Sequence, residues 1–151
     1  MRANALLILL LAIVLPGVLL APVWPLAGLG VGEDEILYYL PSRVFLHDTI
    51  QSGEWPWMNP MTGADRAYAA DPQSALWYPP TWLYVLLDPV LANGVVLWLH
   101  FSVALLGMYR LLRSERLRRQ AAVFGAILFA FSGFMLAHRV HLTMLCSAAW
   151  R

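Results

Sequence analysis

The chain has 151 residues, of which 60% are hydrophobic and only 13% are charged, and its formal net charge is +1. Soluble domains carry about 25% charged residues, so this composition excludes an ordinary soluble protein and indicates a membrane protein. The chain has no block of like charge that would bind nucleic acid. Its single cysteine, Cys146, excludes an internal disulfide and a zinc site made of cysteines alone.

The first apolar stretch runs from Ala3 to Ala21 and contains one polar residue, Asn4. At about 1.5 Å per residue it is long enough to cross about 30 Å of hydrocarbon, which predicts a transmembrane helix over residues 3–22. Arg2, just before this stretch, also fits the basic start of a signal peptide, but no clear small-x-small cleavage site follows. We interpret the stretch as a retained signal anchor, with a cleavable signal peptide as the alternative.

Two further apolar stretches predict transmembrane helices over residues 90–109 and 121–137. Between them, residues 110–120 read RLLRSERLRRQ and contain five arginines against one acid, Glu115. A short arginine-rich loop next to membrane ends belongs on the cytoplasmic side. The last of these helices has small residues four positions apart, which predicts close packing against another helix: Ala122, Ala126 and Ala130.

The basic loop sets the direction of the rest of the chain. With residues 110–120 inside, the N-terminus is also inside, and residues 23–89 and 138–151 are outside. Eight of the nine acids lie between Glu33 and Asp88, so the external loop is acidic. The predicted fold is therefore all-α: one membrane domain over residues 1–151, a polytopic membrane protein with about three transmembrane helices and an external loop of interfacial helices.

The external loop has three predicted parts. Apolar residues at helical spacing predict a helix that begins near Asp34 and stops at Ser52-Gly53, with Pro41 either kinking it or opening it. Residues 53–60, GEWPWMNP, predict an irregular run at the membrane surface, where tryptophan is enriched. Residues 70–87 begin as a turn and continue as an apolar stretch too short to span.

Three acids in a row, Glu33, Asp34 and Glu35, follow the first apolar stretch. Acids at the start of a helix complement its dipole and supply a capping oxygen, a contribution of about 0.3–2 kcal/mol. The alternative is a catalytic carboxylate at the membrane surface, where a lipid-linked substrate presents its head group. Spacing alone leaves both interpretations open.

Three motifs follow one another in the external loop. The first, D-x-x-x-Y-Y-x-P-x-R-x-F, comprises Asp34, Tyr38, Tyr39, Pro41, Arg43 and Phe45. The second, G-E-x-P-x-x-N-P, covers residues 53–60, and the third, A-D-P-Q-x-A-x-x-Y-P-P, covers residues 70–80. In order and spacing, from residue 32 through GMYRLLR and FSGFMLAHRVHLTML to Trp150, the chain resembles the N-terminal portion of the YfhO-like bacterial membrane proteins.

The resemblance implies the start of a GT-C-like fold and a glycosyltransferase of the bacterial cytoplasmic membrane. Such enzymes take a sugar from a polyprenyl-phosphate carrier on the outer face and pass it to a cell-envelope glycan, lipid or protein. The family's acidic residue near the start of the first external loop corresponds to Asp34, the expected general base, with Glu35 as a second catalytic acid. We expect no cofactor, no metal and no nucleic acid partner.

A second set of residues is predicted to bind the substrate. Arginine holds phosphate oxygens well, and the external candidates are Arg43 and Arg139, with His138 and His141 as assistants, although each also fits an ordinary surface position. The motif positions that the resemblance adds are Tyr38, Tyr39, Asp71 and Gln73. Asp71 also fits a plain turn-forming role, because it precedes a proline.

Members of this family are several times longer, so we expect the chain to be the N-terminal portion of such an enzyme. A small non-catalytic subunit or scaffold of an envelope complex is the alternative. A transporter is disfavoured, since transporters place polar residues in the middle of several spans. In this chain His100 is such a residue, whereas most polar residues gather in the external loop.

Overall fold

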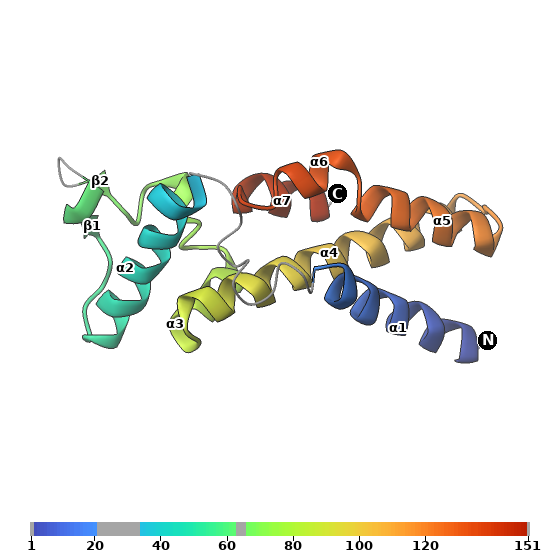
Figure 1. The fold of residues 1–151 in the computed structure, drawn as a ribbon, viewed down its shortest axis with the longest axis horizontal. Coiled ribbons are helices and arrows are strands. Elements are labelled where there is room, and N and C mark those ends of the chain that lie inside the picture. Colours follow the sequence, from blue (N-terminus) through green and yellow to red (C-terminus); the bar gives the residue numbers. More distant parts are fainter. Residues whose placement is uncertain (1, 21–33, 63–65, 151) are drawn as a thin grey trace. The chain divides into compact units, whose positions relative to one another are not determined.

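The computed structural model describes residues 2–20, 34–62 and 66–150, and it is mostly helical, at 75% (Figure 1). The helical prediction is therefore confirmed. The chain divides into two compact units, which are described separately below. The helical unit comprises the described residues of Met1–Trp24 and Leu97–Arg151, and the loop unit those of Pro25–Val96. Glu33 and the last two residues of the predicted span 3–22 lie outside the described residues.

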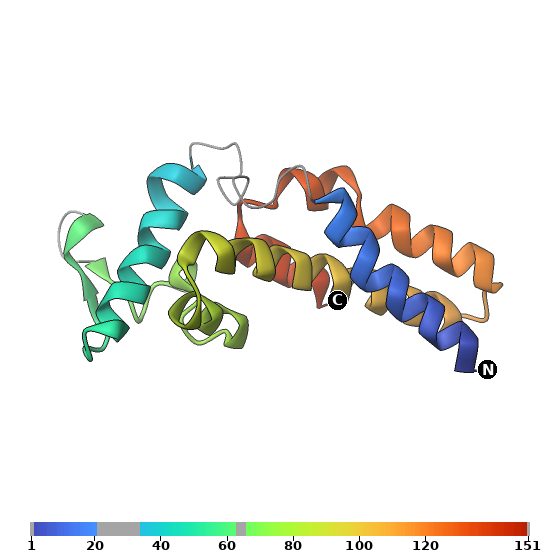
Figure 2. The ribbon, with the colours of Figure 1, turned by 60° about the horizontal axis from the view of Figure 1, so that its bottom comes forward.

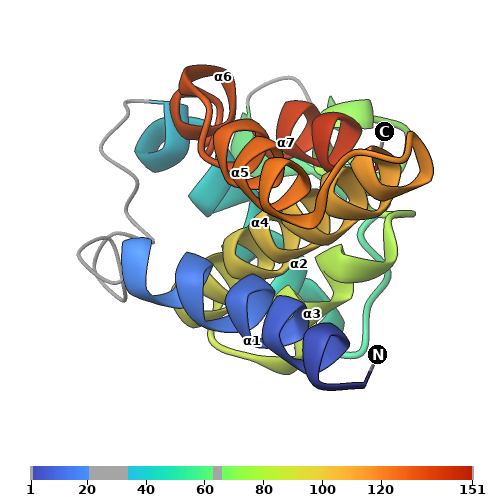
Figure 3. The ribbon, with the colours of Figure 1, turned by 90° about the vertical axis from the view of Figure 1, so that its right-hand side faces the viewer.

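The helical unit is built around α4 (Pro89–Ser114), whose first residues, up to Val96, belong to the loop unit. Helices α1 (Arg2–Leu19) and α5 (Arg119–Ala130) lie on opposite sides of α4 (Figures 1 and 3). The indole N–H of Trp98 on α4 donates a 2.8 Å hydrogen bond to the carbonyl of Ile13 on α1. The shared core contains apolar residues of these helices, including Ala12, Phe101, Leu105 and Ala126, together with Leu145 from near the end of the chain.

Helix α5 turns back along α4 (Figure 2), and its small residues make the approach possible. Ala122, Ala126 and Ala130 are all fully buried, which confirms the predicted packing face. A methyl group added at Gly125 would stand 2.6 Å from Cδ1 of Leu112 on α4. The glycine therefore leaves room for the leucine side chain between the two helices.

Two helical stretches are long and apolar enough to cross a membrane, Pro89–Ser114 with 26 residues and Arg119–Ala137 with 19. Length and composition alone give this result, and the core helix of a soluble protein meets the same criterion. Within α1, Leu7–Leu19 forms a shorter apolar helix. Helix α4 extends to Ser114, past the predicted end at residue 109, because arginine and leucine favour helix and carry it on through the polar segment.

The sequence predicted one continuous helix over residues 121–137, and that prediction was wrong. The stretch Arg119–Ala137 is broken into two helices. Phe131 leaves the helical conformation, and a short helix, α6 (Gly133–Ala137), begins after Ser132. The Ser132 hydroxyl accepts a hydrogen bond from the Met135 N–H at 3.4 Å, so serine acts as an N-cap. A last helix, α7 (Leu142–Ala149), follows and completes the helical unit.

In the loop unit, the predicted helix is present from residue 34 to 51. A π-helical turn, Glu35–Tyr39, leads into α2 (Leu40–Gln51), and Pro41 stands in the first turn of α2. A proline has no N–H to donate, and a widened turn before it accommodates the missing bond. The helix ends at Ser52, and Gly53 takes a left-handed φ of +82°, as the predicted stop requires.

Between α2 and the start of α4, the described part of the loop unit consists of short elements. Strand β1 (Met58–Asn59) pairs antiparallel with β2 (Arg66–Ala67), with Met58 opposite Ala67. Three 3-10 turns, Pro60–Thr62, Pro72–Ser74 and Pro79–Trp82, precede α3 (Leu83–Leu86). The sequence did not predict the hairpin, because strands of two residues are too short to show alternation. Leu46, Tyr68, Leu76 and Val85 form the small core of this unit.

Candidate active site

Two of the sequence motifs meet in the loop unit. The Tyr38 hydroxyl donates to Oδ2 of Asp71 at 3.0 Å, and the Tyr39 hydroxyl donates to Oε1 of Gln73 at 2.7 Å. The other oxygen of Asp71, Oδ1, accepts from the backbone N–H of Gln73 at 2.8 Å and caps the 3-10 turn. Asp71 thus forms the turn and also binds the helix through Tyr38. The two tyrosines fasten the start of the helix to this turn.

Arg43 is the third link between the helix and the same turn. Its side chain is only 3% exposed. Its guanidinium donates to the backbone carbonyls of Ser74 and, at 3.4 Å, Gln73, and it lies 5.3 Å from the centre of the Tyr84 ring. A substrate phosphate would have to displace these contacts, so this arrangement suits a buried cation that holds the turn.

Glu35 is the buried carboxyl group of the unit, also 3% exposed. Its Oε1 accepts a 3.0 Å hydrogen bond from the side-chain amide of Asn93 on α4, whose Oδ1 accepts from the Tyr84 hydroxyl at 2.6 Å. Burial raises the pKa of Glu35 from 4.5 to about 7, and the charge of Arg43 and the Asn93 hydrogen bond partly oppose this. Glu35 therefore changes protonation near neutral pH, as general acids and bases do.

Asp34 is exposed at the start of the helix, one turn before Tyr38. Its backbone is already helical, and its side chain makes no capping hydrogen bond to the described backbone, which weakens the capping interpretation. Burial raises the pKa of the Tyr39 phenol, and the nearby Tyr38 and the negative charge of Asp34 raise it further. Burial and the hydrogen bond to Asp71 likewise raise the pKa of Tyr38. Both phenols remain neutral hydrogen-bond donors.

A pocket of about 360 Å³ opens beside these residues, within the usual range of about 300–1,000 Å³ for ligand sites. Side chains of the helix and of the hairpin line it: Leu37, Tyr38, Pro41, Ser42, Asn59, Met61 and Arg66. The guanidinium of Arg66 lies 4.0 Å from Oδ2 of Asp71, and its side chain is 62% exposed. The cation nearest an incoming ligand is thus Arg66, with Arg43 held inside.

Several of these residues were not expected from the sequence. Arg66 had a usable signal, since it and Arg43 are the two arginines of the predicted external loop. Asn93 and Tyr84 had no signal in the sequence for a role in the site, because they stand in apolar runs. The pairing of Asn93 with Glu35 spans 58 positions and depends on the fold.

Arg139 and His141 belong to the helical unit, in the turn between α6 and α7. There the Arg139 guanidinium donates to the carbonyl of Leu136 at 2.9 Å, and His141 precedes the first residue of α7. His138 stacks on Phe134 with 4.3 Å between ring centres. Across residues 2–20, 34–62 and 66–150, no three histidine, cysteine or acidic side chains gather to hold a metal ion.

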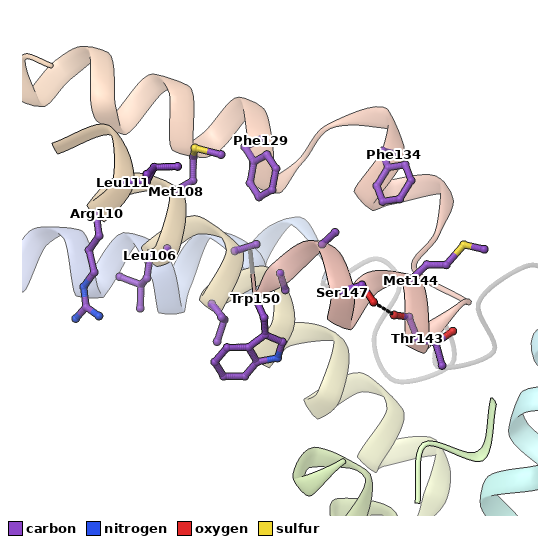
Figure 4. Close-up of a pocket in the computed structure, with 15 residues that line it drawn as sticks. Leu106, Met108, Arg110, Leu111, Phe129, Phe134, Thr143, Met144, Ser147 and Trp150 are labelled. Carbon is purple, nitrogen blue, oxygen red and sulfur yellow. Dashed lines mark hydrogen bonds between the residues drawn. The ribbon is translucent and has the colours of Figure 1, made fainter. Parts of the chain in front are cut away.

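The helical unit has a larger, apolar groove of about 900 Å³ (Figure 4). Its walls come from the second half of α4 and from residues 129–150, with Phe129, Phe134 and Trp150 among the lining side chains. Arg110 is the charged residue among those that line it. This groove suits an apolar chain or a further helix more than a polar substrate.

Comparison with protein-family models, with curated proteins and with solved structures finds no match to this chain. The functional conclusion therefore depends on the chemistry of the loop unit. There, the exposed guanidinium of Arg66 and the neutral phenol of Tyr38 line one pocket, and the exposed carboxylate of Asp34 precedes Tyr38 by one helical turn. Such a set suits proton transfer to or from a hydroxyl-rich ligand and the binding of an anionic group.

Proposed function

We propose that the protein is a membrane glycosyltransferase of the GT-C type. It takes a sugar from a polyprenyl-phosphate carrier on the outer face of a bacterial cytoplasmic membrane and transfers it to a cell-envelope glycan, lipid or protein. The single observation that carries the proposal is the pocket that begins one helical turn after Asp34 and ends at Arg66. The motif resemblance and the two apolar helices support it.

In the proposed reaction, Asp34 is the general base. Its exposed carboxylate accepts the proton of the acceptor hydroxyl as that oxygen attacks the anomeric carbon of the sugar, a task worth about 10²–10⁴-fold in rate. The bond from the anomeric carbon to the phosphate oxygen breaks, and polyprenyl phosphate leaves with the bonding electrons. Arg66 stabilises the negative charge of the leaving phosphate with its two donor groups.

Glu35 acts as a positioning residue in this scheme. It is buried and bound to Asn93, so it fixes the backbone at the residue next to Asp34. Tyr38 and Tyr39 hold the same turn from the other side through Asp71 and Gln73. A catalytic carboxylate must be held within a fraction of an ångström of its productive geometry, and this frame supplies that rigidity.

The proposed topology is multi-pass, with the N-terminus inside and the loop unit outside. Between α4 and α5, Arg116 and Arg118 extend the basic segment that begins with Arg110, and such segments remain cytoplasmic. Residues 34–89 contain seven acids and two arginines, a balance compatible with the outer side. The acidic loop and its pocket then meet a lipid-linked donor at the outer surface.

The test is sugar transfer in membranes that contain the protein and radiolabelled polyprenyl-phosphate glucose, galactose or mannose. We expect Asp34→Asn to lower transfer by at least about 100-fold at unchanged protein level. Asp48→Asn is the matched control, an exposed acid on the same helix, and it should leave transfer unchanged. Normal transfer by Asp34→Asn would remove Asp34 from the role of general base.

A second candidate is a non-catalytic subunit or scaffold of an envelope complex. The apolar groove of the helical unit favours it, because Phe134, Met144 and Trp150 in its wall are each about half exposed or more and offer a surface for a partner helix. Rescue of a deletion strain by wild type and by Asp34→Asn discriminates between a scaffold and a glycosyltransferase. A scaffold keeps its effect after Asp34→Asn, and a glycosyltransferase loses it.

A further inference from the structure

Four tryptophans of the loop unit form one aromatic surface, here called the tryptophan platform: Trp55, Trp57, Trp77 and Trp82. Trp55 is at its centre, with ring centres 6.1 Å from Trp57, 6.1 Å from Trp77 and 5.9 Å from Trp82. Trp57 and Trp77 are 64% and 70% exposed. None of this surface takes part in the proposed catalytic step.

The platform is held rigidly from below. The Trp77 indole N–H donates to the carbonyl of Ala69 at 2.9 Å, and the Trp82 indole N–H donates to the carbonyl of Leu76 at 3.1 Å. The Trp57 backbone N–H donates to the carbonyl of Trp55 at 2.8 Å across a fully buried Pro56. Ordering the rings on binding therefore costs little entropy, which is the advantage of a preorganised aromatic surface.

We propose that the tryptophan platform binds a neutral glycan, by stacking of pyranose rings on the indole faces. The C–H bonds on one face of a pyranose carry a partial positive charge, and an aromatic ring is negative on its face, so the two attract. The ring tilts of 41° and 57° around Trp55 give a curved surface that contacts successive sugar units.

Charge favours a neutral glycan over a membrane as the occupant. In the sequence, residues 34–89 carry seven acids against two arginines, and Glu54, next to Trp55, is exposed. Surfaces that bind anionic lipid carry a basic excess, and this one repels anionic head groups. Carboxylates also accept hydrogen bonds from sugar hydroxyls. The indole N–H groups of Trp77 and Trp82, which interfacial tryptophans offer to head groups, are already bonded inside the protein.

Residues 68–71 link the platform to the candidate active site. Ala69, which binds Trp77, lies next to Tyr68, whose hydroxyl donates to the carbonyl of Ser42 in the wall of the pocket. Two residues after Ala69, Asp71 binds Tyr38. Through this link the platform would serve as the acceptor subsite, and the acceptor class would be a neutral glycan. That part of the inference rests on the proposed transfer reaction, whereas glycan binding does not.

The test uses the whole chain in nanodiscs of zwitterionic lipid, with cellohexaose, maltohexaose and mannohexaose as probes and calorimetry as the readout. We expect at least one probe to bind, Trp57→Ala and Trp77→Ala each to weaken it about two- to tenfold, and the double variant to weaken it further. Trp150→Ala is the control, since Trp150 is 62% exposed and lies in the helical unit. Binding should be unaffected by that change.

Two results would overturn the proposal. One is that none of the three probes binds. The other is that spin-labelled lipid quenches the fluorescence of Trp57 and Trp77, measured as the difference between wild type and the Trp57→Ala/Trp77→Ala variant, and that added sugar does not change this quenching. The platform would then be a membrane anchor. Asp34→Asn separates this inference from the proposed function, because it should bind the probe normally while sugar transfer is lost.

Discussion

The side-chain amide of Asn93 donates a 3.0 Å hydrogen bond to the carboxyl group of Glu35, across 58 positions of the chain. This bond attaches the start of α4 to the acidic start of the loop helix. Tyr84 extends the connection, since its hydroxyl donates to Asn93 at 2.6 Å. The carboxyl group is thus buried and bound, and its neighbour Asp34 is exposed, one helical turn before Tyr38 in the pocket wall.

The stability of the protein should depend on pH through Glu35. The folded-state pKa of this acid, about 7, lies above its ordinary value of 4.5, so the folded protein holds the proton more tightly than the unfolded one. The contribution of Glu35 to stability is then fully present below pH 4.5, falls as pH rises to about 7, and is lost above that, a change on the order of 3 kcal/mol.

Glu35→Gln should remove this dependence, because a glutamine oxygen still accepts from Asn93 and never ionises. The measurement is thermal unfolding in detergent at pH 5 and pH 8, compared between wild type and variant. Wild type should lose more stability than Glu35→Gln over this interval. Parallel changes in the two proteins would contradict the assignment.

Arg43 should be intolerant of lysine. A lysine ammonium is a point charge without the planar fork, so Arg43→Lys loses part of the contact to the carbonyls of Gln73 and Ser74 and the packing over Tyr84. We expect a loss of about 1–3 kcal/mol in unfolding free energy. Arg66→Lys is the control, and as an exposed substitution it should change stability by less than about 0.5 kcal/mol.

Removing the charge at the same position should also affect Glu35. The positive charge of Arg43 lowers the pKa of Glu35, so Arg43→Gln should move that pKa above 7. The measurement is the pH midpoint of the stability change that Glu35→Gln abolishes. A midpoint unchanged by Arg43→Gln would show that the two groups do not interact.

Gly125 and Gly107 offer a matched pair in the helical unit. Alanine at Gly107 meets no atom within 4 Å, so it should stabilise α4 by up to about 1 kcal/mol through helix propensity. Alanine at Gly125 meets Cδ1 of Leu112 at 2.6 Å and forces that side chain to move. We expect Gly125→Ala to be less stable than Gly107→Ala by about 1 kcal/mol, measured as thermal unfolding in detergent. Equal effects would exclude close packing of α5 on α4 at this point.

Cys146 and His100 form another contact that substitution tests. The sulfur of Cys146 lies 3.1 Å from Nε2 of His100, which is fully buried. Cys146→Ala removes this partner and should cost about 1 kcal/mol in unfolding free energy, whereas Cys146→Ser keeps a hydroxyl that bonds the imidazole. The unfolding free energies of the two variants are measured from the ratio of folded to unfolded protein in a thermal scan. Equal losses would mean that the imidazole does not need this partner.

The sequence by itself determined where the longer helices lie, but it did not predict α3 or α7. Apolar runs of the right length predicted α4 and the stretch from α5 to α6, and Ser52-Gly53 predicted the end of α2, because periodicity and helix stop signals are local properties of the chain. Alanines four residues apart likewise predicted the buried face of α5. The break at Ser132 was missed, since a serine inside an apolar run does not distinguish a cap from a continuing helix.

Only the tertiary structure decided which acid is buried and which is exposed. Asp34 and Glu35 are neighbours with the same chemistry, but Glu35 is buried, bonded to Asn93, which Tyr84 holds in turn, and within reach of the charge of Arg43. It also turned Arg43 inward and left Arg66 at the pocket. Burial and pKa depend on what packs around a group in space, and that information is not contained in the spacing of residues along the chain.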